Sequence, residues 1–185
     1  IESALNSQPP VALAVVSEPP TGPIIEALRR FATGGGQVLW LLKNAAAGKS
    51  LAQLVGVAGL EVTEAPSANY FMMGQIDFEH PLFKPFADAR FSDFTRVYFW
   101  RHRRLKAEQL PQARIVARFD DGDPALIEMP VAKGRVFVLC SAWTPEDSQL
   151  ARSSKFVPFL FTFLDQAGGL KARSTQYIVG DAVDL

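Results

Sequence analysis

The sequence predicts a single α/β domain built around a mostly parallel sheet. Two continuous apolar runs, residues 11–16 (VALAVV) and 37–42 (QVLWLL), are typical of strands that a sheet buries on both faces. Between them, apolar residues recur at helical spacing from Pro23 to Phe31, and the glycines at 34–36 end that pattern. A strand, a helix and a strand in this order favour parallel pairing through a right-handed crossover.

The middle of the chain predicts shorter elements. Ser50 is expected to cap a helix that continues through Leu54 and ends at Gly56 or Gly59. His80 and the proline after it are expected to begin a short helix or turn. Extended segments are expected at residues 60–63, 71–78 and 97–100.

The last third of the chain predicts antiparallel strands. Residues 113–119 alternate in polarity, and the run from Asp120 to Pro124 is a strong turn signal before residues 125–129. Lys133 and Gly134 turn the chain again, and residues 135–140 (RVFVLC) predict a buried strand. We therefore expect an antiparallel addition joined to the parallel sheet.

The end of the chain predicts a final helix followed by a segment outside the α/β domain. Ser153 or Ser154 is expected to cap a helix over residues 155–167, which Gly168 and Gly169 end. Residues 171–185 are expected to form a linker and the start of a following β module. The predicted α/β domain therefore spans residues 1–170.

Composition excludes several classes of function. The 185 residues have a formal net charge of +0, which argues against general binding to nucleic acid or to an anionic membrane. A single cysteine, Cys140, excludes an internal disulfide and a multi-cysteine metal site. No stretch is long and apolar enough to span a bilayer.

The loop at residues 45–50 (AAAGKS) lies where a phosphate-binding loop would lie. Such a loop also needs a glycine five positions before Gly48, and that position is Lys43. An ordinary connection from strand to helix explains the loop better. We predict no cofactor.

The candidate catalytic residues are few. Cys140 ends an apolar strand and is expected to be a small core residue rather than a nucleophile. His80 is a candidate base, or a metal ligand with Asp77 and Glu79, but it is better explained as a turn residue. His102 is also a candidate base and belongs to a basic strand end.

Charged and aromatic clusters leave further alternatives. The basic run from Arg101 to Lys106 predicts either a partner with acidic groups or an edge strand guarded by positive charge. Asp120, Asp121 and Asp123 lack the full spacing of a calcium loop, so a hairpin turn explains them better. Glu146 and Asp147 are expected at a loop or helix start, and Trp40 and Trp143 in the core or an interface.

Several segments together resemble one family. They are VALAVVSEPP with IIEALRRFATGGGQVLWLL, then HPLFKPF, then ARIVARFDDGDPALIEMPVAKGRVFVLCSAW and FVPFLFTFL. In this order they resemble the amidotransferase-like domain of bacterial Bat-type membrane proteins, which also carry a von Willebrand A domain. The resemblance covers residues 11–168. It implies a three-layer, flavodoxin-like fold of the class I glutamine amidotransferase-like kind.

The resemblance does not extend to amidotransferase chemistry. Catalytic members of that fold place a cysteine in a sharp turn between a strand and a helix, and a His-Glu pair later in the chain. Here the corresponding turn, Lys43 to Gly48, holds no cysteine, and no His-x-Glu occurs near the last strand. We therefore predict no catalytic, cofactor-binding or metal-binding residues.

The leading hypothesis is a non-catalytic interaction or structural module, whose partners are proteins or other domains of the same chain and not nucleic acid. Because the chain opens on Ile1, it is expected to be a fragment of a larger protein. The resemblance implies that this fragment is a soluble domain of a bacterial inner-membrane protein. A divergent hydrolase using Glu18, His80 or Asp147 is a weaker hypothesis. The main alternative is a small-ligand or carbohydrate-binding domain. Its binding rim would lie at the carboxyl ends of the strands and include Ser17, Glu18, Lys43, Asn44, Ser141 and Trp143.

Overall fold

The computed structural model describes residues 5, 11–20, 22–66, 69–110 and 112–168. The segment predicted to be a linker and the start of a β module, residues 171–185, lies outside the described residues. Among the described residues, no helix is long and apolar enough to cross a membrane.

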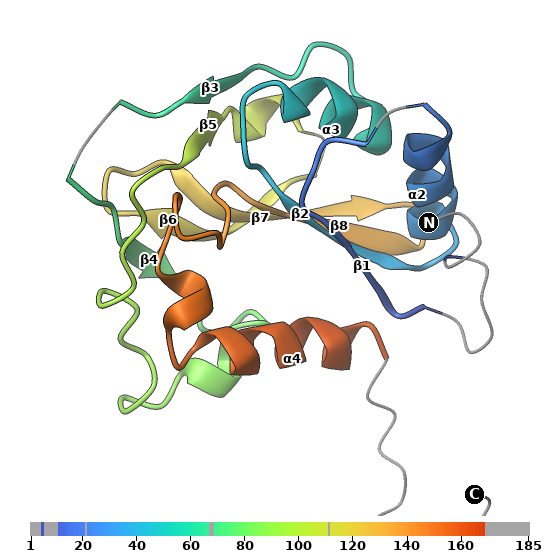
Figure 1. The fold of residues 1–185 in the computed structure, drawn as a ribbon. Coiled ribbons are helices and arrows are strands. Elements are labelled where there is room, and N and C mark those ends of the chain that lie inside the picture. The colour runs from blue at the N-terminus through green and yellow to red at the C-terminus, as the bar shows by residue number, and fades with distance from the viewer. Residues whose placement is uncertain (1–4, 6–10, 21, 67–68, 111, 169–185) are drawn as a thin grey trace, which may run out of the picture.

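Within the part of the chain that the structure describes, eleven longer helices and strands make up the fold (Figure 1). In chain order they are β1 (Leu13–Val16), α2 (Pro23–Thr33), β2 (Gln37–Leu41), α3 (Ala47–Val55), β3 (Val62–Glu64), β4 (Met73–Ile76), β5 (Arg103–Leu105), β6 (Arg114–Phe119), β7 (Pro124–Val131), β8 (Gly134–Leu139) and α4 (Phe156–Gln166). Short 3₁₀ turns occur at Lys84–Phe86, Ala107–Gln109 and Leu150–Arg152.

The main sheet has six strands in the order β1-β2-β8-β7-β6-β4. The pairs β1–β2 and β2–β8 are parallel, which confirms the predicted strand-helix-strand unit. The pairs β8–β7, β7–β6 and β6–β4 are antiparallel, so the sheet is mixed, although β1, β2, β6 and β8 all run in one direction. The predicted antiparallel strands are confirmed, and they join the parallel pair through β8, which lies between β2 and β7.

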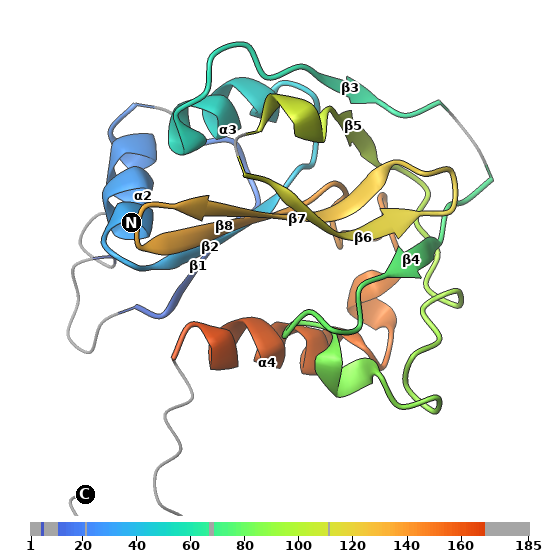
Figure 2. The ribbon, with the colours of Figure 1, turned by 180° about the vertical axis from the view of Figure 1, so that it is seen from behind.

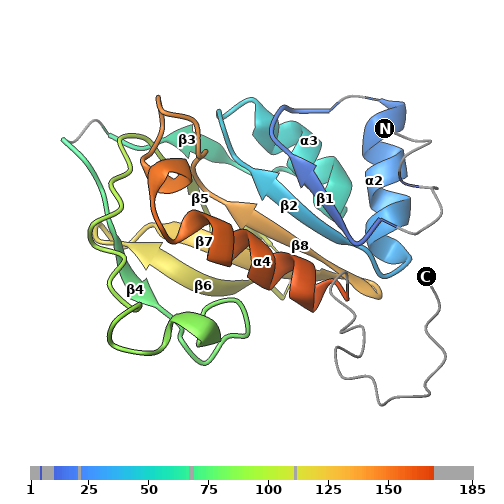
Figure 3. The ribbon, with the colours of Figure 1, turned by 60° about the horizontal axis from the view of Figure 1, so that its bottom comes forward.

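Helices cover both faces of this sheet. Helices α2 and α3 lie on one face, and α4 lies on the other (Figures 1 and 2). The tilted view in Figure 3 shows α4 crossing the sheet on its own. The contact is aromatic, since the rings of Phe137 on β8 and Phe163 on α4 lie 5.1 Å apart, centroid to centroid. Both side chains are fully buried, so this layer forms part of the central core.

The two predicted buried strands differ in the structure. All five residues of β2 are buried, as expected for a central strand. Strand β1 lies at the end of the sheet, and its Val15 side chain is 47% exposed. The expectation that residues 11–16 are buried on both faces is therefore wrong, because among the described residues β1 has a neighbouring strand on one side only.

Helix α3 is capped differently from the prediction. The helix begins at Ala47, and the Asn44 side chain accepts a hydrogen bond from the Ala47 N–H at 3.0 Å. Ser50 lies inside the helix, so its predicted capping role is wrong. The predicted end is confirmed at Gly56, whose φ of 76° is a left-handed conformation that favours glycine.

Two further predictions need correction. Residues 97–100 form no strand. Phe99 makes isolated bridges to Phe71 and Ser148, and the strand of this region is β5, which pairs with β3. At α4 no serine side chain caps the helix, and Ser153 Oγ instead donates to the Leu150 carbonyl at 2.8 Å.

Candidate functional site

The structure places the predicted rim residues beyond the ends of three neighbouring parallel strands. Ser17 and Glu18 follow β1, Lys43 and Asn44 follow β2, and Ser141 and Trp143 come shortly after β8. The strands are in register, because Val16 pairs with Trp40 and Trp40 pairs with Val138. The carboxyl ends of the strands therefore lie at one edge of the sheet, where ligands of open α/β sheets usually bind.

An ion pair joins the first two strand ends. Lys43 Nζ lies 2.5 Å from Glu18 Oε1, although both side chains are substantially exposed. The hydrogen bond and the charge of Glu18 raise the pKa of Lys43. Lys43 is thus held as a cation at the rim. It is poorly suited to act as a neutral nucleophile or base.

Two of the predicted rim residues serve the fold instead. The Asn44 side chain caps α3, as described above. Ser141 is fully buried, and its hydroxyl donates to the Arg101 carbonyl at 2.7 Å. Ser141 therefore lies beneath the rim and does not present its hydroxyl to a ligand.

Trp143 is half-buried beside the start of α4. Its ring meets the ring of Phe156 edge to face, with centroids 5.2 Å apart. The prediction that Trp143 is a core or interface residue is confirmed for its packed side. Nearby, hydrogen bonds from its own backbone N–H and from Thr144 are the main causes of the lowered pKa of Glu146. The charges of Lys43 and Arg101 lower it further.

A buried ionic network lies directly behind this rim and was not predicted from the sequence. The Arg103 guanidinium is paired with both carboxylate oxygens of Asp147, and its Nε donates to Glu64 at 2.9 Å. Arg103 and Asp147 are each only 3% exposed. Asp147 also accepts a hydrogen bond from the Ala142 N–H at 3.2 Å, so the network fixes the segment after β8.

The turn after β2 is joined to the ionic network by a backbone hydrogen bond. It runs from Lys43 into α3, and the Ala45 N–H donates to Glu64 at 3.2 Å. Glu64 therefore connects this turn with Arg103.

Cys140 is a core residue, as predicted. It is fully buried, and burial raises its pKa to about 12. Its carbonyl accepts a hydrogen bond from the Arg103 N–H at 2.7 Å. The thiol is therefore neither accessible nor ionised at neutral pH.

His80 has a structural role beside β7. Its Nδ1 accepts a hydrogen bond from the Leu82 N–H at 3.2 Å, and its Nε2 lies 3.0 Å from Glu128 Oε2. Both ring nitrogens have partners, and the ring is 1% exposed. The prediction that His80 shapes a turn is confirmed. Asp77, a candidate metal ligand together with His80, has a lowered pKa. The main cause is the hydrogen bond from Arg114, and the backbone N–H of His80 contributes less.

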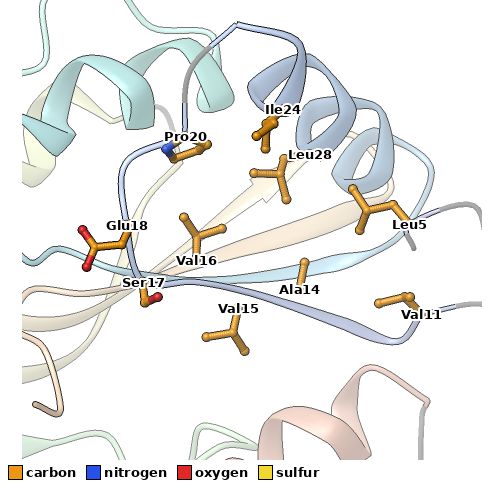
Figure 4. Close-up of a pocket in the computed structure, with 10 residues that line it drawn as sticks. All are labelled: Leu5, Val11, Ala14, Val15, Val16, Ser17, Glu18, Pro20, Ile24 and Leu28. Carbon is orange, nitrogen blue, oxygen red and sulfur yellow. The ribbon is translucent and has the colours of Figure 1, made fainter. Parts of the chain in front are cut away.

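A mainly apolar groove adjoins the rim at the end of the sheet (Figure 4). The groove has a volume of about 360 Å³ and lies between β1 and α2. Val16 and Leu28 point into it, whereas Val15 points to the other face of β1. Ser17 and Glu18 lie at its rim end, so two predicted rim residues border a concave surface.

The sequence matches no protein-family model. No curated protein sequence matches it either. Solved structures do resemble the fold. A cytoplasmic protein from Salmonella typhimurium matches with a TM-score of 0.61 at 13% identity, over 90% of this chain and 74% of that one. A protein from Parabacteroides merdae described as ThuA-like matches with a TM-score of 0.55 at 14% identity, over 93% and 75%.

A β-galactosidase from Bacillus circulans contains a similar fold. Its TM-score is 0.53 at 12% identity, and the match covers 84% of this chain but only 22% of the enzyme. At such identities, likeness shows the fold alone. The neighbours therefore support an α/β fold for this chain and nothing about its activity.

Proposed function

We propose that this chain is a non-catalytic interaction or structural module with an amidotransferase-like fold. The observation that carries the proposal is the turn after β2, where a catalytic relative would hold its cysteine. That turn begins with Lys43, whose ammonium group is paired with Glu18. The single cysteine of the chain lies elsewhere, fully buried after β8.

The end of the sheet supports a binding role. Among the described residues, β1 pairs only with β2, so its outer backbone groups are free to pair with another strand. The groove between β1 and α2 offers an apolar surface along the same strand. An extended segment from another domain of the parent chain would use both, through added strand pairing.

The test of this proposal is an assay for glutamine hydrolysis by the purified chain. We expect no release of ammonia above the buffer control, and we expect Cys140→Ser to behave like the unchanged chain. Lys43→Ala serves as a second variant, because it alters the turn itself. Ammonia release that Cys140→Ser abolishes would show that the module is an enzyme.

Carbohydrate or small-ligand binding is the second candidate. It is favoured by the half-buried Trp143, which follows β8 three residues before Glu146, since ligand pockets combine aromatic side chains with a few polar groups. A thermal-shift screen with neutral mono- and disaccharides tests it. Stabilisation that Trp143→Ala removes would support it, and no stabilisation by any sugar would reject it.

The parent protein is proposed to be a Bat-type membrane protein with a von Willebrand A domain. The support is the order of the resembling segments in the sequence, from residue 11 to residue 168. Sequencing the gene that encodes this chain tests the proposal. We expect transmembrane segments and a von Willebrand A domain in the same reading frame, and a reading frame without them would contradict it.

A further inference from the structure

Three polar side chains from two separate segments converge beside the rim. His102 precedes β5, and Asp121 and Asp123 belong to the turn between β6 and β7. His102 Nε2 lies 3.0 Å from Asp123 Oδ2 and 3.3 Å from Asp121 Oδ2. Because β6 runs in the same direction as β8, this turn lies at the carboxyl edge of the sheet.

The position of the imidazole is fixed by packing. His102 is 1% exposed and lies between two aromatic rings, with centroid distances of 4.3 Å to Phe71 and 4.4 Å to Phe119. Among the described residues, His102 Nδ1 has no hydrogen-bond partner. His80 differs in this respect, since both of its ring nitrogens are partnered. The polar contacts that His102 makes with the described residues are therefore all at Nε2, the atom that faces the two carboxylates.

The cluster also has more acceptors than donors. The single N–H at Nε2 of a neutral imidazole makes one strong hydrogen bond, yet two carboxylates face it. Arg104 neutralises only one of them, through its Nε at 2.6 Å from Asp123 Oδ2. Asp121 Oδ1 accepts from the Asp123 N–H at 3.0 Å, which leaves Asp121 Oδ2 directed towards His102.

The separations suit a metal ion as well as a hydrogen bond. A regular tetrahedron with metal–ligand bonds of about 2.0 Å has edges of about 3.3 Å. The two nitrogen–oxygen distances, 3.0 and 3.3 Å, are close to such edges, and the three ligand atoms lie within 4.8 Å of one another. A cation about 2.0 Å from Nε2, in place of its proton, would lie between the imidazole and the two carboxylates.

We propose that His102, Asp121 and Asp123 bind a divalent transition-metal ion of the zinc type. An imidazole ligand favours zinc over magnesium or calcium, and two carboxylates balance the charge of the ion. The carboxylate side chains are 23% exposed, so a fourth position faces solvent. Asp123 also lines a cleft of about 350 Å³ with Arg104, from which a small anion could reach that position.

The metal would link two parts of the fold that are distant in sequence. It would bind the β6–β7 turn to the segment that leads into β5, next to Arg103 and its buried network. Arg104 competes for Asp123, and its exposed side chain is free to move away. The site therefore predicts that removing the Arg104 charge strengthens metal binding.

The experiment is titration calorimetry of the chelator-treated, full chain with ZnCl₂. We expect one Zn²⁺ per chain, binding weakened roughly tenfold or more by Asp121→Asn, and tighter binding by Arg104→Gln. Asp88→Asn is the matched control, because Asp88 lies in a distant exposed turn and pairs with Arg90. Thermal unfolding without metal verifies that each variant folds.

Cobalt(II) provides a spectroscopic measurement of the same site. We expect visible bands of a nitrogen- and oxygen-ligated ion without a thiolate charge-transfer band, unchanged by Cys140→Ser. Absence of stoichiometric Zn²⁺ binding, or equal affinity of a folded Asp121→Asn variant, would overturn the proposal. So would nitrogen NMR showing His102 doubly protonated at neutral pH while Zn²⁺ leaves its signals unchanged.

Discussion

Arg103 holds a full positive charge in the interior of this protein. Its charge is balanced by Asp147 within the core and by Glu64 at the surface. Removing water from both members of a buried pair is costly, so such a pair adds little net stability against an apolar alternative. Removing only one member of the pair is strongly destabilising, because the other charge then stays buried without a partner.

Asp147→Asn should therefore destabilise the protein strongly. We expect a loss of about 3 kcal/mol in the free energy of unfolding, because Arg103 keeps its charge and loses its buried counterion. Urea unfolding followed by tryptophan fluorescence measures the loss. Glu64→Gln is the matched control, and we expect a smaller effect because the Glu64 side chain is 51% exposed. Equal effects of the two substitutions would contradict this account.

The thiol of Cys140 should not react with thiol reagents in the folded protein. With its pKa raised to about 12, roughly one thiol in ten thousand is ionised at pH 8, and burial blocks access of the reagent. We expect an aromatic disulfide reagent to modify the thiol only after the protein is unfolded in guanidinium chloride. Rapid modification of the native protein would mean that the end of β8 opens readily.

The sequence identifies individual buried groups unevenly. Cys140 and His80 were assigned correctly because their neighbours are apolar or turn-forming. Arg103 was not, because the basic run around it looks uniformly solvated. In the structure, strand β5 turns Arg103 inward and Arg104 outward. The partner of Arg103 is 44 residues away, and no local pattern reports a pairing over that distance.

At the scale of whole elements, strands β1 and β2 show that the sequence does not predict which strand is central in the sheet. Their sequences are nearly equally apolar, and both were predicted to be buried. Their order in the sheet makes β2 central and β1 an end strand. That order depends on where β8 inserts, about a hundred residues later in the chain, so a local pattern predicts the strands but not their neighbours.

Substitutions at two paired residues, one in β1 and one in β2, should show that an end strand and a central strand are buried to different degrees. Val15 pairs with Leu39, and both side chains point to the same face. We expect Leu39→Ala to cost about 2–5 kcal/mol, because its side chain is fully buried. Val15→Lys should change the free energy of unfolding by only about 0.5 kcal/mol. Chemical denaturation measures both, and a large cost at Val15 would mean that another part of the chain covers it.

The turn into β8 depends on a missing side chain. A Cβ atom at Gly134 would overlap the carbonyl oxygens of Ala32 and Gly36. We expect Gly134→Ala to lower the free energy of unfolding by about 3 kcal/mol, because backbone cannot move aside as a side chain can. Gly34→Ala is the control, since Gly34 has helical dihedrals and looser surroundings. A thermal scan of both variants should show the large shift for Gly134 only.

At the scale of the whole molecule, carboxylates that are better stabilised when folded govern the response to acid. A hydrogen bond from His80 is the main cause of the lowered pKa of Glu128, and one from Arg114 lowers that of Asp77. A lowered folded pKa stabilises the protein above the ordinary value, which is 4.5 for Glu128 and 3.8 for Asp77. That contribution is lost as the pH falls through the folded pKa.

We therefore expect the urea midpoint to fall between about pH 5 and about pH 3. Glu128→Gln should reduce the slope in that range, because the substituted amide does not titrate. Asp88→Asn serves as a control, and we expect a smaller change in slope, because the pair that lowers the pKa of Asp88 is with Arg90 at the solvent-exposed surface. A slope that Glu128→Gln leaves unchanged would show that other groups dominate the acid response.

The central place of β8 has a consequence for how the protein is made. Strands β1 and β2 leave the ribosome early, but the partner that completes β2 on its other side is not synthesised until residue 139. Until then the growing chain exposes one apolar edge of β2. Such long-range pairing slows folding and leaves a period open to aggregation. Release of a nascent chain that ends before β8 should therefore yield an insoluble product, whereas a chain that ends after α4 should fold.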